Sequence, residues 1–90
     1  MTTGLYRAFA SIRNEKEFNN FLRDLCTPDE IRALNNRWEI AQLLSDGKLS
    51  QSEISEKLNT GLATVSRVAR SLNDPLTGGY RQAISNIHHA

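Results

Sequence analysis

The chain has 90 residues, of which 39% are hydrophobic and 23% charged, with a formal net charge of +1. This balance predicts one globular domain over residues 1–90 and excludes both a disordered chain and a strongly basic nucleic-acid-binding protein. No apolar run reaches the about 18 residues that cross a membrane, and residues 1–11 lack the pattern of a signal peptide. We therefore expect a soluble, cytoplasmic protein that binds no membrane.

Few side chains are suited to metal binding or catalysis. Cys26 is the single cysteine and has no cysteine or histidine at metal-ligand spacing, so we expect it to be a buried apolar residue. The two histidines, His88 and His89, lie at the end of the sequence, and whether they belong to the native protein stays open. No cluster of acid, base and nucleophile is visible, so we expect no metal site and no enzyme.

Two short helices are predicted before residue 26. Asn14 and Glu17 have the spacing of a capping box, in which each side chain accepts from the other residue's backbone N–H, and they are expected to open the second helix. The first helix is predicted from apolar residues at helical spacing, namely Leu5, Tyr6, Phe9 and Ile12.

A longer third helix is predicted from about Pro28 to Asp46. Thr27 and Glu30 form a second capping box, and proline at the first helical position gives up a donor that would be unpaired anyway. Gly47 is expected to end the helix in the left-handed conformation. Apolar residues cover more than one stripe of this helix, so we expect it to be buried from several sides.

Residues 50–73 contain two helical patterns joined by a three-residue turn, which is the pattern of a helix-turn-helix. The capping pair Ser50 and Glu53 opens the first of these helices. Asn59 tolerates the left-handed conformation that the turn requires, and Val65 and Val68 are expected to pack the second helix inward. Pro75 ends this region, and a last helix is predicted over residues 77–88. The predicted fold class is all-α, with about six helices.

The start of the second helix in this pair is expected to face outward with small residues. Small side chains let a helix backbone approach the floor of the DNA major groove, where hydroxyls and methyls can meet base edges. The alternative is a helical dimerisation or adaptor module that binds protein, because similar helix pairs occur in domains that bind no DNA. The outward residues are Leu62, Ala63, Thr64, Ser66, Arg67 and Arg70.

The stretch LCTPDEIRALNNRWEIAQLLSDGKLSQSEISEKLNTGLATVSRVARSLN resembles the core of the bacterial Trp repressor superfamily, in particular its YerC/YecD (TrpR-related) branch. It joins a Thr-Pro-Asp-Glu helix start, a Gly-x-x-Ser-Gln link and a Gly-x-Ala-Thr-x-x-Arg recognition helix. The resemblance implies an intertwined homodimer. Residues 1–46 would supply its dimerisation helices, residues 50–73 its helix-turn-helix, and residues 77–88 its C-terminal helix.

The resemblance also implies a sequence-specific transcriptional regulator, which we expect to be a repressor, with the helix over residues 62–72 in the major groove of double-stranded DNA. Thr64 and Ser66 would read bases, whereas Gln51, Ser52 and the helix N-termini would position phosphates. The DNA-binding residues that the resemblance implies are Gln51, Ser52, Ser55, Leu62, Ala63, Thr64 and Ser66. Arg70 is predicted either to add a phosphate contact or to be a solvated surface residue.

The tryptophan-responsive members of that family bind the amino acid between two arginines and a threonine. The implied ligand-binding residues here are Thr27, Arg37, Thr64, Arg67 and Ser71. Two departures argue against tryptophan as a corepressor. Val68 stands where the tryptophan binder has a glycine, and Asp24, in place of a leucine, carries a carboxylate that would replace the ligand's. The protein would then bind DNA without tryptophan, and a different anionic effector stays open.

Overall fold

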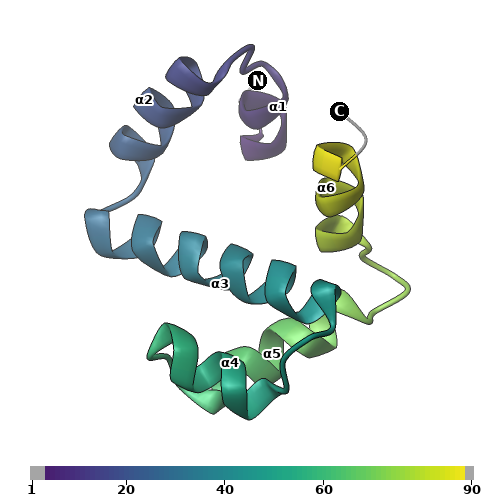
Figure 1. Ribbon diagram of the computed structural model, residues 1–90. Helices are drawn as coiled ribbons and strands as arrows, with labels where there is room; N and C mark the ends of the chain where they lie inside the picture. Colours follow the sequence, from purple (N-terminus) through teal and green to yellow (C-terminus); the bar gives the residue numbers. More distant parts are fainter. Residues whose placement is uncertain (1–3, 89–90) are drawn as a thin grey trace. The chain divides into compact units, whose positions relative to one another are not determined.

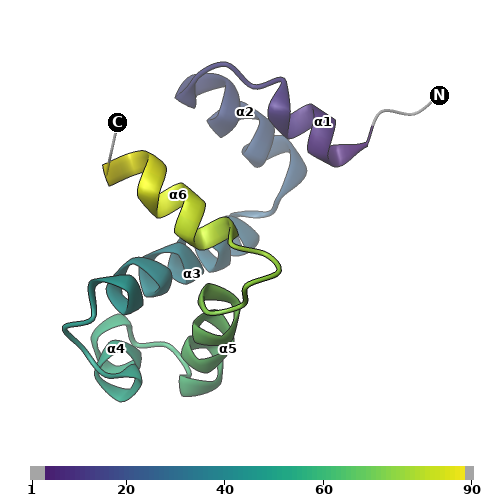
Figure 2. The same ribbon diagram turned by 90° about the vertical axis from the view of Figure 1, so that its right-hand side faces the viewer.

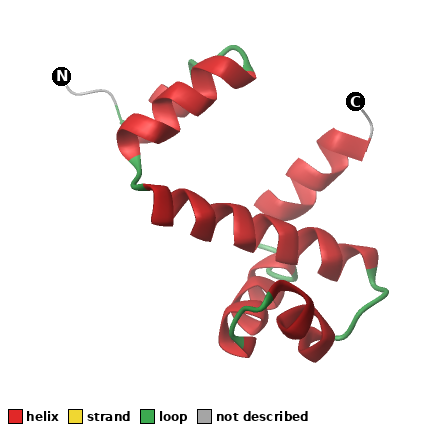
Figure 3. Cartoon of the chain, turned by 60° about the vertical axis from the view of Figure 1, so that its left-hand side comes forward, coloured by secondary structure: helices red, strands yellow, loops and turns green. Residues whose placement is uncertain are grey.

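Six α-helices make up the computed structural model, which describes residues 4–88 (Figures 1 and 3). No strand occurs between residues 4 and 88, so the predicted all-α class is confirmed. His89, one of the two histidines noted above, lies outside the described residues. Within that range no helix combines the length and the apolar character needed to cross a membrane. In chain order the helices are α1 Leu5–Ala10, α2 Glu15–Leu25, α3 Pro28–Asp46, α4 Gln51–Leu58, α5 Leu62–Leu72 and α6 Gly79–His88.

The chain forms two compact units, Met1–Arg32 and Ala33–Ala90. In the first unit, α1 packs on α2 through aromatic rings. The ring centroid of Phe9 lies 5.7 Å from that of Phe18 and 5.5 Å from that of Phe21. These separations are typical of favourable aromatic pairs, so Phe9 holds α1 against α2.

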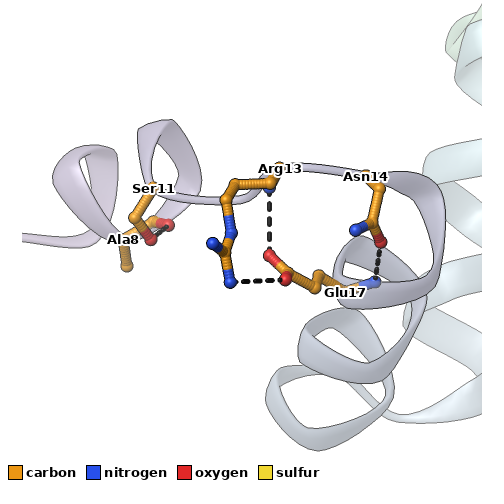
Figure 4. Close-up of polar contacts among 5 residues, drawn as sticks. All are labelled: Ala8, Ser11, Arg13, Asn14 and Glu17. Carbon is orange, nitrogen blue, oxygen red and sulfur yellow. Dashed lines mark hydrogen bonds and ion pairs between the residues drawn. The ribbon is translucent and has the colours of Figure 1, made fainter.

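The start of α2 differs in one detail from the predicted capping box (Figure 4). The Asn14 side chain accepts from the Glu17 N–H at 2.9 Å, as expected. The Glu17 carboxylate does not return to Asn14, so the reciprocal half of that prediction is wrong. It accepts from the Arg13 N–H at 3.0 Å and from the Arg13 guanidinium at 3.3 Å. Arg13 offers this carboxylate both a backbone donor and a positive charge, which strengthens the hydrogen bond.

The capping box at the start of α3 is confirmed. The Thr27 N–H donates to the Glu30 carboxylate at 2.8 Å, and the Thr27 hydroxyl accepts from the Glu30 N–H at 3.2 Å. Gly47, with φ of 77°, follows α3 in the left-handed conformation, also as predicted.

Burial falls short of two predictions. Cys26 is half-buried, not buried, because it lies beyond the last turn of α2 as the C-cap residue. Within α3 the fully buried residues are Ile40 and Ala41, whereas Leu34 is 41% exposed. The expected burial of α3 from several sides therefore holds only for its second half.

The core of the second unit lies between α3, α4 and α5. In Figures 1 and 2, α4 and α5 lie side by side against the second half of α3. Trp38 of α3 and Tyr80 of α6 are among the partly buried residues that pack around this core. The fully buried side chains that form the cluster are Ile40, Ala41, Ile54, Val65 and Val68.

Arg81 of α6 binds the last residue of α5 and the chain just after it. Its guanidinium donates to the backbone oxygen of Leu72 at 2.8 Å and to that of Asp74 at 3.2 Å. A positive charge is favourable at a helix C-terminus, where backbone carbonyls lack helical partners. Arg81 thereby links α6 to the end of α5.

Candidate nucleic-acid interface

The turn between α4 and α5 is held from three sides. Asn59 occupies the left-handed conformation, with φ of 50° and ψ of 51°. The Thr60 N–H donates to the Ser55 backbone oxygen at 3.0 Å, and the Ser55 hydroxyl donates to the Thr60 backbone oxygen at 2.6 Å. From α3, the Asn36 amide donates to the Thr60 hydroxyl at 3.1 Å. These contacts fix the angle between the two helices.

The hydrogen bond between Asn36 and Thr60 was not predicted from the sequence. The two residues are 24 positions apart, and neither has a local pattern that marks it as a partner of the other. Their hydrogen bond ties the turn to α3, which contributes Ile40 and Ala41 to the buried core of this unit.

One side of α5 is buried and the other is open. Val65 and Val68 are 0% and 1% exposed, and Ala69 is buried beside them. Leu62, three residues before Val65 at the start of the helix, is 48% exposed. On the side of α5 opposite the valines, the exposed residues are Ala63, Arg67 and Arg70, of which Ala63 and Arg70 are predicted DNA contacts.

The two residues predicted to read bases, Thr64 and Ser66, are half-buried at the edge of this surface. The Ser66 hydroxyl is engaged within the protein, because it donates to the Gln51 side-chain oxygen at 2.8 Å. Gln51 is the first residue of α4 and is exposed. The structure therefore brings together two predicted DNA-binding residues from different helices.

The remaining predicted DNA contacts of α4 differ in their surroundings. Ser52 is exposed in the first turn of the helix. Ser55 is half-buried, and its hydroxyl donates into the turn at Thr60 instead of toward solvent. The Ser52 side chain therefore faces solvent, whereas the Ser55 hydroxyl is engaged in the turn.

The N-termini of α4 and α5 differ in how far the positive end of the helix dipole is balanced. The predicted capping box of α4 is confirmed: the Glu53 carboxylate accepts from the Ser50 N–H at 2.8 Å, and the Ser50 hydroxyl accepts from the Glu53 N–H at 3.1 Å. Hydrogen bonding of the carboxyl group to Ser50, through its backbone N–H first and its hydroxyl second, holds the pKa of Glu53 below its ordinary value. The start of α5 has no side-chain cap and no acidic residue in its first turn. The positive end of the helix dipole is therefore unopposed at α5 but partly balanced at α4.

The predicted ligand-binding residues divide between the two units. Thr27 belongs to the first unit, whereas Arg37, Thr64, Arg67 and Ser71 belong to the second. Val68 fills part of the core with its methyl groups and is not available to move aside for a ligand. Between residues 4 and 88 no three histidine, cysteine, aspartate or glutamate side chains form a group that could hold a metal ion.

Known proteins resemble this chain in sequence and in structure. A crystal structure of a TrpR-like protein from Eubacterium eligens superposes with a TM-score of 0.81 at 34% sequence identity, covering 93% of this chain and 84% of that one. The uncharacterized protein YerC of Bacillus subtilis is 36% identical over 69 residues, which are 77% of this chain and 65% of that protein.

A Trp operon repressor homolog of Vibrio vulnificus is 41% identical over 58 residues, which are 64% of this chain and 57% of that protein. The match thus spans less than two thirds of the length of both curated relatives. The family model described as Trp repressor protein matches residues 3–88. With the helical order and the helix-turn-helix already described, this match means that the chain belongs to the Trp repressor family.

Proposed function

We propose that the protein is a sequence-specific DNA-binding transcriptional regulator that acts as a homodimer and inserts α5 into the major groove. The observation that carries the proposal is the division of α5 into a buried and an open side. Val65 and Val68 hold the helix on the core, while Leu62 and Ala63 stay exposed at its uncapped start. A helix held in this way can enter a groove without losing its own packing.

The contacts follow from the position of each side chain. Ala63 and Thr64, near the start of α5, lie where methyl and hydroxyl groups can meet base edges. Arg70, exposed about two turns further on, is assigned to a phosphate. Ser52 is assigned to a phosphate from the first turn of α4, and Ser55 acts indirectly by holding the turn.

Exposed apolar side chains support the homodimer. In the first unit, the helical residue Tyr6 is 89% exposed, and Leu5 and Leu25 are 50% and 47% exposed. Large apolar side chains that stay in water favour association, and a second copy of the chain would cover them. A two-fold dimer would bind two half-sites about 34 Å apart, one turn of DNA.

The choice of repression over activation is based on the relatives, several of which are named Trp operon repressor homologs. We assign the protein to the repressors on that ground. As a regulator it is not an enzyme, and it works on DNA in the cytoplasm.

Tryptophan is not required in this proposal. Val68 is packed in the core at the position where an indole would need space, and Asp24 is exposed on α2. We infer that the carboxylate of Asp24 replaces that of a ligand beside the arginines of a partner chain. Adding tryptophan is then expected to leave the affinity for DNA unchanged.

Salt-dependent binding to DNA tests the proposal. Duplexes selected by the protein from a random pool are titrated at several salt concentrations, and the logarithm of the binding constant should fall by about 0.9 for each phosphate contact per tenfold rise in salt. Enrichment of no sequence, or binding without this dependence, would reject the proposal. Retention of a protein partner instead would favour the adaptor module.

A further inference from the structure

The side chains of Gln51 and Ser66 join α4 to α5 on the surface assigned to DNA. Ser66 lies in the second turn of α5, 15 residues after Gln51, and its hydroxyl donates to the Gln51 oxygen at 2.8 Å. Gln51 is exposed, and Ser66 is half-buried. The hydrogen bond therefore reaches outward from the packed helix to a side chain that is otherwise free to rotate.

The direction of this hydrogen bond determines what Gln51 can bind. A glutamine amide has one oxygen that accepts and one nitrogen that donates two hydrogens. With the oxygen turned toward Ser66, the nitrogen is left to donate. A side chain held in this way suits a partner that only accepts hydrogen bonds.

A phosphate oxygen of the DNA backbone is such a partner. Reading adenine with glutamine needs both the oxygen and the nitrogen of the amide, and here the oxygen is engaged by Ser66. In a helix-turn-helix the first helix crosses the DNA backbone, and Gln51 is the first residue of that helix. At the start of the same helix, the Ser50 N–H already donates to the Glu53 carboxylate. This backbone donor is therefore not available to a phosphate, whereas the Gln51 amide is.

We infer that Ser66 is a positioning residue, which holds the Gln51 oxygen so that the Gln51 amide nitrogen donates to a phosphate. This inference rests on the proposed function and refines it, because Ser66 was expected to read a base directly. Ser66 acts through Gln51, and the pair contributes affinity that does not depend on the base sequence.

A double-mutant cycle on one selected duplex tests this coupling. Ser66→Ala is expected to weaken binding about two- to twelvefold, the range for one hydrogen bond. In the Gln51→Ala background the same change should have no further effect, because the residue that Ser66 positions is already gone. Ser66→Thr keeps the hydroxyl and should restore binding, and Ser45→Ala, an exposed serine of α3, serves as the control.

Gln51→Glu separates the two halves of the amide. Glutamate still accepts from Ser66 but replaces the donor nitrogen with a negative oxygen, so it should bind DNA more weakly than Gln51→Ala does. The loss of affinity caused by Ser66→Ala should also be the same, within error, on selected duplexes that differ in base sequence, and so should the loss caused by Gln51→Ala.

The free protein provides a measurement that does not depend on DNA. NMR relaxation of the Gln51 side-chain amide should show an ordered group in the wild type and a mobile one in Ser66→Ala, with Ser66→Thr like the wild type. If the wild type binds no duplex, the proposed function fails and this inference with it. If the wild type binds but the losses add, or the Gln51 amide is equally mobile in all three proteins, the inference fails and the proposed function stands.

Discussion

Asn59 shows how one residue sets the geometry of the candidate interface. Its φ of 50° lies in the left-handed region, which is costly for residues with a Cβ and least so for asparagine and aspartate. The conformation was predictable because it depends on the local chain. The hydrogen bond between Ser66 and Gln51 was not, because it depends on how α5 packs beside α4.

Substitution of Asn59 tests the strain in the turn. Asn59→Val should lower the free energy of unfolding by about 1–2 kcal/mol, since a β-branched side chain strongly disfavours positive φ. Asn59→Gly should stay within about 0.5 kcal/mol of the wild type, because glycine adopts this conformation without a steric cost. Urea unfolding of both variants makes the comparison, and equal losses would contradict this explanation of the turn.

The helices themselves were predictable from short-range patterns. The capping pairs at α3 and α4 occur as expected, because they need only a serine or threonine and a glutamate three residues apart. At α2 the same spacing gave only half of a box, since Arg13 lies beside Asn14 and competes for the Glu17 carboxylate. Local rules therefore fix where a helix starts better than they fix every contact around its start.

The cap of α4 should make stability depend on pH. The pKa of Glu53 is lowered in the folded protein, so its contribution is present above the unfolded value of about 4.3 and is lost as the pH falls through the folded value. Glu53→Gln should lower the urea midpoint at pH 7, and the difference from the wild type should shrink near pH 3. Glu56→Gln, an exposed residue outside the cap, is the control. A difference that stays constant with pH would contradict the role of the charged cap.

At the scale of the whole molecule, the sequence predicted the fold class and the six helices, but not the extent of burial. Leu34 and Tyr6 fit the apolar patterns of their helices, yet they are 41% and 89% exposed. A pattern along the chain shows which side of a helix is apolar, and contacts between helices decide whether that side is covered. Covering these residues with a second chain is the reason for the proposed dimer.

The helix-turn-helix was predictable for a related reason. Of the residues whose spacing puts them on its inner side, Ile54, Val65 and Val68 are buried, and Leu58 is partly buried against them. Its outer residues were harder to assign, because Thr64 and Ser66 lie at the edge of the open side and not at its centre. A contact of either residue with DNA would form only in a complex of two chains with a duplex, and a local pattern does not encode such a complex.

The entry of α5 into the major groove is tested most directly by an acidic residue at its start. Thr64→Glu and the control Thr77→Glu, in the exposed loop before α6, add the same charge to the chain. We expect Thr64→Glu to abolish binding to the selected duplex, Thr77→Glu to bind like the wild type, and both variants to keep the mass of a dimer and a cooperative unfolding transition. Wild-type affinity in Thr64→Glu, with the dimer intact, would contradict the placement of α5 in the groove.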